Sequence, residues 1–172
     1  MKIRFAEELQ PVLLLAPVAI TDSVVQSNYL RVNKAHWASF LVQFGAFSDS
    51  DDTCTVGVTV ECSTASASNA TKEAITYKYR LSGKVGTSTW GTITETTSTT
   101  GIEIKSETDE NKMLLIDVDP SKLDVDQPDG FWLRVVLTPG ATGAATDVSG
   151  IVSVTGILEP RYPSNSMPSA TS

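Results

Sequence analysis

The amino-acid sequence predicts an all-β protein, an antiparallel β-sandwich of the jelly-roll type with extended N- and C-terminal arms. Apolar residues recur at every second position through most of the chain, as in half-buried strands. Segments rich in Gly, Pro, Asn, Asp and Ser interrupt these patterns about every 8 to 20 residues. Long amphipathic helical patterns between the strands are absent, which excludes doubly wound folds and TIM barrels.

Residues 1–22 are predicted to form an extended N-terminal arm. They are rich in apolar residues but lack a regular period of two, and they contain Pro11 and Pro17. An arm of this kind contributes little to folding and serves attachment. The alternative is that Val12–Ile20 is the first strand of the sandwich.

Residues 23–158 are predicted to form the sandwich itself. Its clearest strand is Thr53–Cys62, in which Cys and Val alternate with Thr, Gly and Glu. Met113–Val118 is apolar except for Asp117, which indicates a central strand. Pro120–Leu123 is expected to form one helical turn, capped by Asp119. Further strands are predicted at Ala38–Gly45, Ile75–Leu81, Phe131–Leu137 and Ile151–Leu158, with weaker ones at Asn28–Val32, Thr89–Glu95 and Ile102–Ser106.

Residues 159–172 are predicted to form an extended C-terminal tail, because they contain three prolines and no strand pattern. Apolar and aromatic side chains in such arms are candidates for burial against a partner. The predicted partner interface consists of Leu13, Leu14, Leu15, Arg161 and Tyr162.

The charge of the chain excludes several classes of partner. Its 172 residues include 13 basic and 20 acidic side chains, a net charge of −7. Since Lys and Arg are not clustered, no nucleic-acid surface is predicted. The apolar run Val12–Ile20 is shorter than the ~20 residues of a membrane span. Glu7 and Glu8 interrupt the approach to it and no cleavage site follows, so neither a signal peptide nor a membrane partner is expected.

The chemistry-bearing residues do not predict an enzyme. His36 is the only histidine, and no nucleophile-elbow motif accompanies it. Cys54 and Cys62 share one predicted strand, so they lie roughly 26 Å apart and cannot pair with each other. Without a CxxC motif or a second histidine, a zinc site is excluded. We therefore expect no catalytic residues, no cofactor and no small-molecule substrate.

Two acidic clusters are interpreted as turns rather than metal sites. The cluster Asp49–Asp52 fails as an EF-hand loop, because its sixth and twelfth positions hold Cys54 and Val60. The second cluster, between Asp117 and Asp129, combines Asp with Pro as turns do. Oxygen ligation of a metal there is the minor alternative.

Three tryptophans, Trp37, Trp90 and Trp132, leave a second possibility open. Exposed aromatic rings on a sandwich could stack on carbohydrate, but packing in the core or at an interface is the more frequent role. Exposed, coplanar tryptophans would favour the carbohydrate interpretation.

Five segments together resemble a known family. They are Glu8–Leu15, Trp37–Ala46, Asn111–Asp119, Phe131–Val135 and Pro160–Pro163. The chain resembles the decoration (cement) proteins of tailed-bacteriophage heads. The resemblance implies a β-sandwich, commonly a homotrimer, on the exterior of the virion capsid, where it bridges neighbouring major capsid protein subunits. It implies no catalytic residues. The alternative function is a carbohydrate- or receptor-binding β-sandwich module of a phage tail or head fibre.

Overall fold

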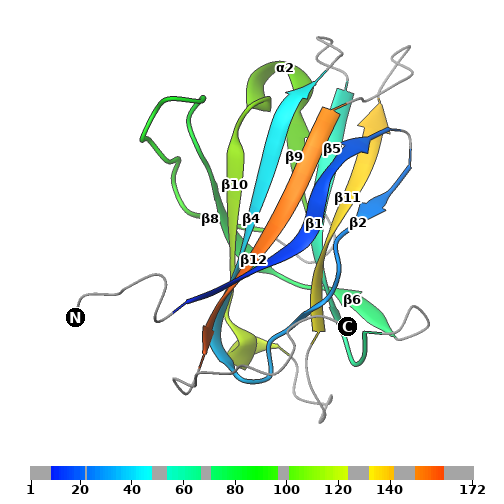
Figure 1. The fold of residues 1–172 in the computed structure, drawn as a ribbon, viewed down its shortest axis with the longest axis vertical. Coiled ribbons are helices and arrows are strands. Elements are labelled where there is room, and N and C mark those ends of the chain that lie inside the picture. Colours follow the sequence, from blue (N-terminus) through cyan, green and yellow to red (C-terminus); the bar gives the residue numbers. More distant parts are fainter. Residues whose placement is uncertain are drawn as a thin grey trace.

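The computed structural model describes residues 9–21, 23–47, 54–66, 71–96, 101–123, 132–141 and 150–160. These residues form two antiparallel sheets packed face to face, which confirms the predicted all-β sandwich (Figure 1). Sheet A contains, in spatial order, β1 (Gln10–Ile20), β12 (Gly150–Pro160), β4 (Ala35–Phe47), β10 (Met113–Val118), β7 (Tyr77–Leu81) and β8 (Thr94–Thr96). Sheet B contains β2 (Val25–Gln26), β11 (Trp132–Ala141), β5 (Cys54–Ser63) and β6 (Lys72–Ala74), with β3 (Leu30–Arg31) also on β11 and β9 (Ile102–Lys105) also on β5.

The connectivity of the described strands is that of a jelly roll. In chain order the frame consists of β1, β2–β3, β4, β5, β9, β10, β11 and β12. Consecutive positions alternate between the sheets, except that β5 and β9 both lie in sheet B. When these eight positions are numbered in chain order, sheet A reads 1-8-3-6 and sheet B reads 2-7-4-5. Strands β6, β7 and β8 are an insertion between β5 and β9, and β7 and β8 extend sheet A beyond β10. The jelly-roll prediction is therefore confirmed.

The core lies between the sheets and follows the alternation of the sequence. Val56, Val58 and Val60 of β5 are fully buried, as are Phe40 and Val42 of β4. Burying a side chain of this size stabilises the fold by roughly 1.5–3 kcal/mol.

The two cysteines lie near opposite ends of β5, as predicted. Cys54 is fully buried and Cys62 is half-buried against the core. Their positions within one strand confirm that they do not bond to each other.

The prediction of an extended arm is wrong for residues 10–20, and the alternative of a first strand is correct. These residues form β1, which pairs with β12 from Gln10 opposite Leu158 to Ile20 opposite Gly150. Two register shifts, between Leu13 and Leu15 and between Leu15 and Val18, interrupt the period of two that would have revealed the strand.

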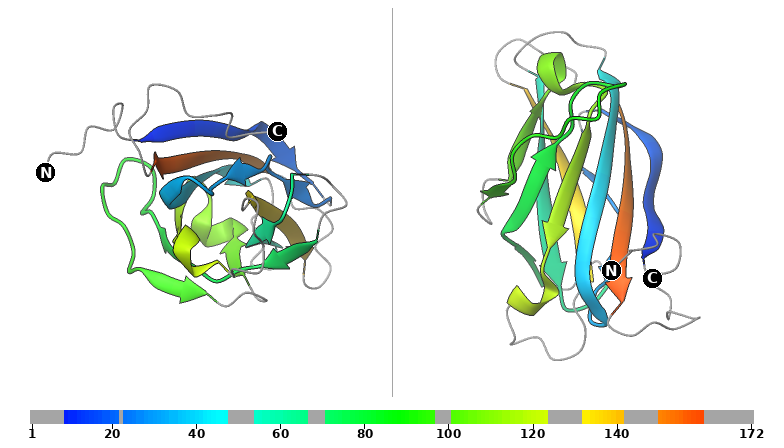
Figure 2. Two further views of the ribbon diagram at one scale, coloured as in Figure 1. Left: turned by 90° about the horizontal axis from the view of Figure 1, so that it is seen from below. Right: turned by 90° about the vertical axis from the view of Figure 1, so that its left-hand side faces the viewer.

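The prolines of β1 are compatible with its place at the edge of sheet A. An edge strand tolerates Pro because half of its N–H groups face outward and need no partner in the sheet. Figure 2 shows β1, in dark blue, along the rim beside β12. Residues 1–8 lie outside the described part of the chain.

Most of the other strands overlap their predicted ranges, but β2 and β6 were not predicted, and β8 overlaps the predicted Thr89–Glu95 only at Thr94 and Glu95. β10 has the predicted bounds, whereas β11 continues beyond Leu137 through Pro139 into a segment predicted to be a loop. Glu159 and Pro160 belong to β12 rather than to a tail. Residues 161–172, with Arg161 and Tyr162, lie outside the described residues.

Helical structure is confined to two short turns in the described residues. They are α2 (Ser106–Asp109) and η1 (Pro120–Lys122). The predicted cap of the second turn is confirmed, because Asp119 Oδ1 accepts a hydrogen bond from the Ser121 N–H at 3.0 Å. None of the helices in the described ranges has the length and apolar character of a membrane span.

Candidate interaction surface

The three leucines predicted to contact a partner are separated by the fold. Leu13 is 62% exposed, whereas Leu14 is 1% exposed and belongs to the core. Leu15 is partly buried and packs against the core. A Cβ at Gly156 of β12 would lie 2.8 Å from Leu14 Cδ1, so the glycine makes room for this leucine. Only Leu13 is placed to meet a partner, and the prediction is wrong for Leu14.

Leu13 is the first member of a row that crosses the outer face of sheet A. Leu13 lies opposite Thr155, Thr155 opposite Leu41, Leu41 opposite Leu115, and Leu115 opposite Arg80. Residues paired in this way point to the same face of a sheet. At 4.7–4.9 Å between strands, the row is roughly 19 Å long. We call these five residues the apolar row, because three of them are leucines.

Polar side chains lie on both sides of the apolar row. On one side Ser39 Oγ donates a hydrogen bond to Asp117 Oδ1 at 2.6 Å. On the other side Ser153 Oγ donates to Gln43 Oε1 at 3.1 Å. An apolar centre with a polar rim is the usual composition of a protein–protein interface.

The edge of sheet A beside β1 is less suited to a partner than its face. Pro11 and Pro17 each lack an N–H group, and the two register shifts distort the strand. Prolines and bulges of this kind block the addition of a further strand. A partner is therefore expected on the face of sheet A, over the apolar row.

The outer face of sheet B carries a charged side chain that its neighbours cover. Arg134 points outward from β11, opposite Glu61, yet is only 6% exposed. Its Nε donates to Glu61 Oε2 at 2.8 Å, and its second terminal nitrogen lies 2.7 Å from the same oxygen. Its other terminal nitrogen donates to Gln26 Oε1 at 2.6 Å, and the guanidinium lies over the Tyr29 ring. This charge already has its partners within the chain.

The tryptophans do not form the coplanar platform that would have favoured the carbohydrate interpretation. Trp132 lies on sheet B with Arg31 over its ring at 5.6 Å. Trp90 bridges to Ser82 next to sheet A, and the Arg80 guanidinium lies 5.0 Å from its ring centroid. Trp37, on β4, is 38% exposed. The three rings thus occupy three separate environments.

Among the described residues, His36 and the two cysteines belong to no metal-binding cluster. His36 is exposed on β4, and no group of three or more His, Cys, Asp or Glu in the described ranges could hold a metal ion. Burial, followed by the charge of Glu73, raises the pKa of the Cys62 thiol to about 11, so it is not an activated nucleophile. Two predicted features, the cluster Asp49–Asp52 and the end of the second acidic stretch at 124–129, lie outside the described residues.

The sequence predictions missed Leu41 and Leu115, although a signal for them was present. Alternation is broken in Phe40-Leu41-Val42 and in Met113–Ile116, where apolar residues follow one another directly. Such runs indicate strands that are apolar on both faces. In this fold one face is the core and the other is the surface of sheet A.

No protein-family model matches the chain, and neither does any curated protein. Similar solved structures include chains of infectious bursal disease virus, Gt strain and Gx strain, which are 12% and 10% identical to this chain with TM-scores of 0.22 and 0.24. Each match covers 88% of this chain but only 41% and 40% of the viral chains, so this chain spans well under half of their length. Values this low establish no shared function.

Proposed function

We propose that the chain is a structural virion protein that decorates and cements a bacteriophage capsid. It acts as a homotrimer on the capsid exterior, where it bridges neighbouring major capsid protein subunits and catalyses no reaction. The observation that carries the proposal is the apolar row on the outer face of sheet A, where Leu13 is 62% exposed and Leu41 and Leu115 are half-buried. The segments that resemble decoration proteins of tailed phages support it.

The physical properties of the apolar row suit attachment to a shell. Leu41 and Leu115 are half-buried by their neighbours, so their side chains lose little conformational freedom when a partner covers them. A face about five strands wide gives a stiff contact area. On a symmetric capsid many weak contacts of this kind add through high effective concentration.

Capsid binding by a charged variant tests the proposal. Leu41→Glu combined with Leu115→Glu places two carboxylates in the centre of the apolar row. We expect a folded protein whose occupancy on capsids of the encoding phage, assembled without the chain, falls about tenfold or more. Thr138→Glu, an exposed position on the outer face of sheet B, is the matched control and should bind normally. Normal occupancy by the double variant would refute the proposed attachment face.

The oligomeric state is tested separately by native mass spectrometry of the purified chain. We expect a trimer at micromolar concentration. A monomer across that range would contradict a self-standing trimer, while leaving attachment through sheet A to be judged by the capsid experiment.

A further inference from the structure

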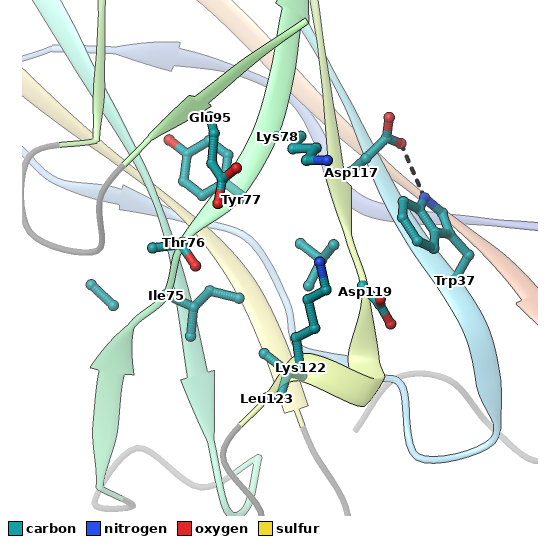
Figure 3. A pocket seen from close by; sticks show the side chains of 12 residues that line it. Trp37, Ile75, Thr76, Tyr77, Lys78, Glu95, Asp117, Asp119, Lys122 and Leu123 are labelled. Atoms are coloured by element: carbon teal, nitrogen blue, oxygen red, sulfur yellow. Dashed lines mark hydrogen bonds between the residues drawn. The ribbon is translucent and has the colours of Figure 1, made fainter.

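A cavity of about 270 Å³ opens at the end of the sandwich where β10 leads into η1 (Figure 3). Its walls come from β4, β7, β8, β10 and η1, and so combine the jelly-roll frame with the insertion. Ile75, Val118 and Leu123 supply apolar lining, while Lys78, Glu95 and Lys122 supply charge. We call this cavity the end pocket.

One wall of the end pocket is aromatic. Trp37 is exposed at the cavity, and its Nε1–H donates a hydrogen bond to Asp117 Oδ1 at 3.4 Å (Figure 3). The bond orients the indole. Unlike Trp90 and Trp132, Trp37 has no arginine over its ring among the described residues. The indole is 38% exposed, so part of its surface can contact a ligand.

The carboxylates of the end pocket are held in place by the chain itself. Asp117 accepts from Ser39 as well as from Trp37, and Asp119 accepts from the Ser121 N–H and from Ser121 Oγ at 2.7 Å. The Ser121 hydrogen bonds lower the pKa of Asp119, so it is ionised at neutral pH. All these bonds use Oδ1, which leaves the second carboxylate oxygen of each residue to accept from another group.

Two lysines add donors to the same cavity. In Figure 3 Lys122 extends from η1 into the pocket, and Lys78 extends toward Asp117. With Glu95, the lining therefore carries three carboxylates and two ammonium groups. The net negative charge disfavours an anionic ligand.

We propose that the end pocket binds a neutral hexopyranose unit of a glycan. Sugar hydroxyls donate to carboxylates and accept from ammonium groups, so both kinds of lining group find partners. The apolar C–H face of the ring stacks on Trp37. Drug-sized ligands occupy pockets of about 300–1,000 Å³, so a cavity just below that range suits a single sugar ring.

Nuclear magnetic resonance of the free, ¹⁵N-labelled chain tests this assignment without capsids. The three indole N–H signals are assigned with single Trp→Phe variants. Glucose, galactose, mannose and N-acetylglucosamine are then titrated into the millimolar range, with sodium glucuronate as the anionic comparison. We expect a saturable shift of the Trp37 signal with at least one neutral sugar, a weaker response to glucuronate, and stationary Trp90 and Trp132 signals.

Variants decide whether the shift reports binding in the end pocket. Trp37→Ala and Asp119→Asn should each weaken sugar binding about tenfold, measured by saturation-transfer difference. Trp90→Ala is the matched control and should bind like the parent chain. The Asp119→Asn variant retains the shape of the site, so it keeps the test valid if Trp37→Ala unfolds.

Three results would overturn the proposal: a Trp37 signal that no neutral sugar moves, equal shifts of all three indoles, or unchanged binding by both variants. None of them affects attachment through the apolar row, because these measurements contain no capsid.

Discussion

The outer faces of the two sheets are built from the same strand alternation but leave different surfaces. On sheet B the outward-facing Arg134 is covered by Tyr29 and paired with Glu61 and Gln26. On sheet A the corresponding outward positions hold the apolar row, with Leu13 largely exposed.

The comparison shows that the covered charge on sheet B has its partners within the chain. Arg134 is paired with Glu61 and Gln26, so this side chain gains little from association. A contiguous apolar surface is costly to expose to water and generally marks a site of interaction. The difference between the faces supports the proposed attachment through sheet A.

The largest difference in stability is expected between variants of two neighbouring leucines in β1. Leu14→Ala should reduce the free energy of unfolding by about 2–5 kcal/mol, because it leaves a cavity in the core. Leu13→Ala should change it by less than about 0.5 kcal/mol. Urea denaturation of the two variants measures the difference. Equal losses would mean that β1 is not packed as described.

A smaller loss of stability is expected when Glu61, the carboxylate paired with Arg134 on sheet B, is removed. Glu61→Ala should cost about 1–3 kcal/mol, since Arg134 stays largely buried without its carboxylate. The double variant Glu61→Leu with Arg134→Met removes both charges and should be more stable than Glu61→Ala. Thermal denaturation gives the order, and a double variant less stable than Glu61→Ala would show that the pair is needed as such.

The reactivity of the Cys62 thiol tests the environment at the edge of sheet B. There Cys62 lies opposite Glu73 of β6. Its pKa of about 11 predicts slow alkylation by iodoacetamide at pH 8 and faster alkylation as the pH approaches that value. Because the pKa in the folded protein lies above its ordinary value of 9.0, the thiol contributes stability to the fold below pH 9, and this contribution is lost between pH 9 and about 11. Glu73→Gln should lower the pKa and accelerate labelling. Rapid labelling of the folded parent chain at pH 8 would contradict this environment.

The smallest expected effect is that of a reducing agent. Cys54 and Cys62 lie in one strand and cannot bond to each other, so dithiothreitol should leave the melting temperature unchanged. A shift of several degrees would reveal a disulfide that the described fold does not contain.

The sequence was sufficient for the fold wherever one face of a strand is polar. β5 and β10 were predicted nearly to the residue because alternation or an unbroken apolar run is local information. β1 was missed because two register shifts remove the period of two. Which outward residues form a surface depends on the pairing of strands far apart in the chain, and no local pattern contains it. Leu41 and Leu115 are 74 positions apart in sequence (115 − 41) and directly paired.

The composition of the end pocket likewise depends on the pairing of strands that are far apart in the chain. Trp37 and Asp117 were singled out separately, one as a packing residue and the other as part of a turn. Only the antiparallel pairing of β4 with β10 brings them together. Lys78 reaches them through the pairing of β7 with β10, which the sequence does not specify.

The insertion β6–β8 has a consequence for how such a protein can diversify. It joins the frame at an open sheet edge and is fastened by Tyr77, whose hydroxyl donates to the Val58 carbonyl oxygen at 2.6 Å. It contributes Ile75, Lys78 and Glu95 to the end pocket, while the frame contributes Trp37 and the aspartates. Exchanging this segment between related chains would alter ligand preference while the eight-strand frame stays the same, provided that the exchanged segment keeps the buried Tyr77. Recognition and architecture can thus evolve at different rates within one small domain.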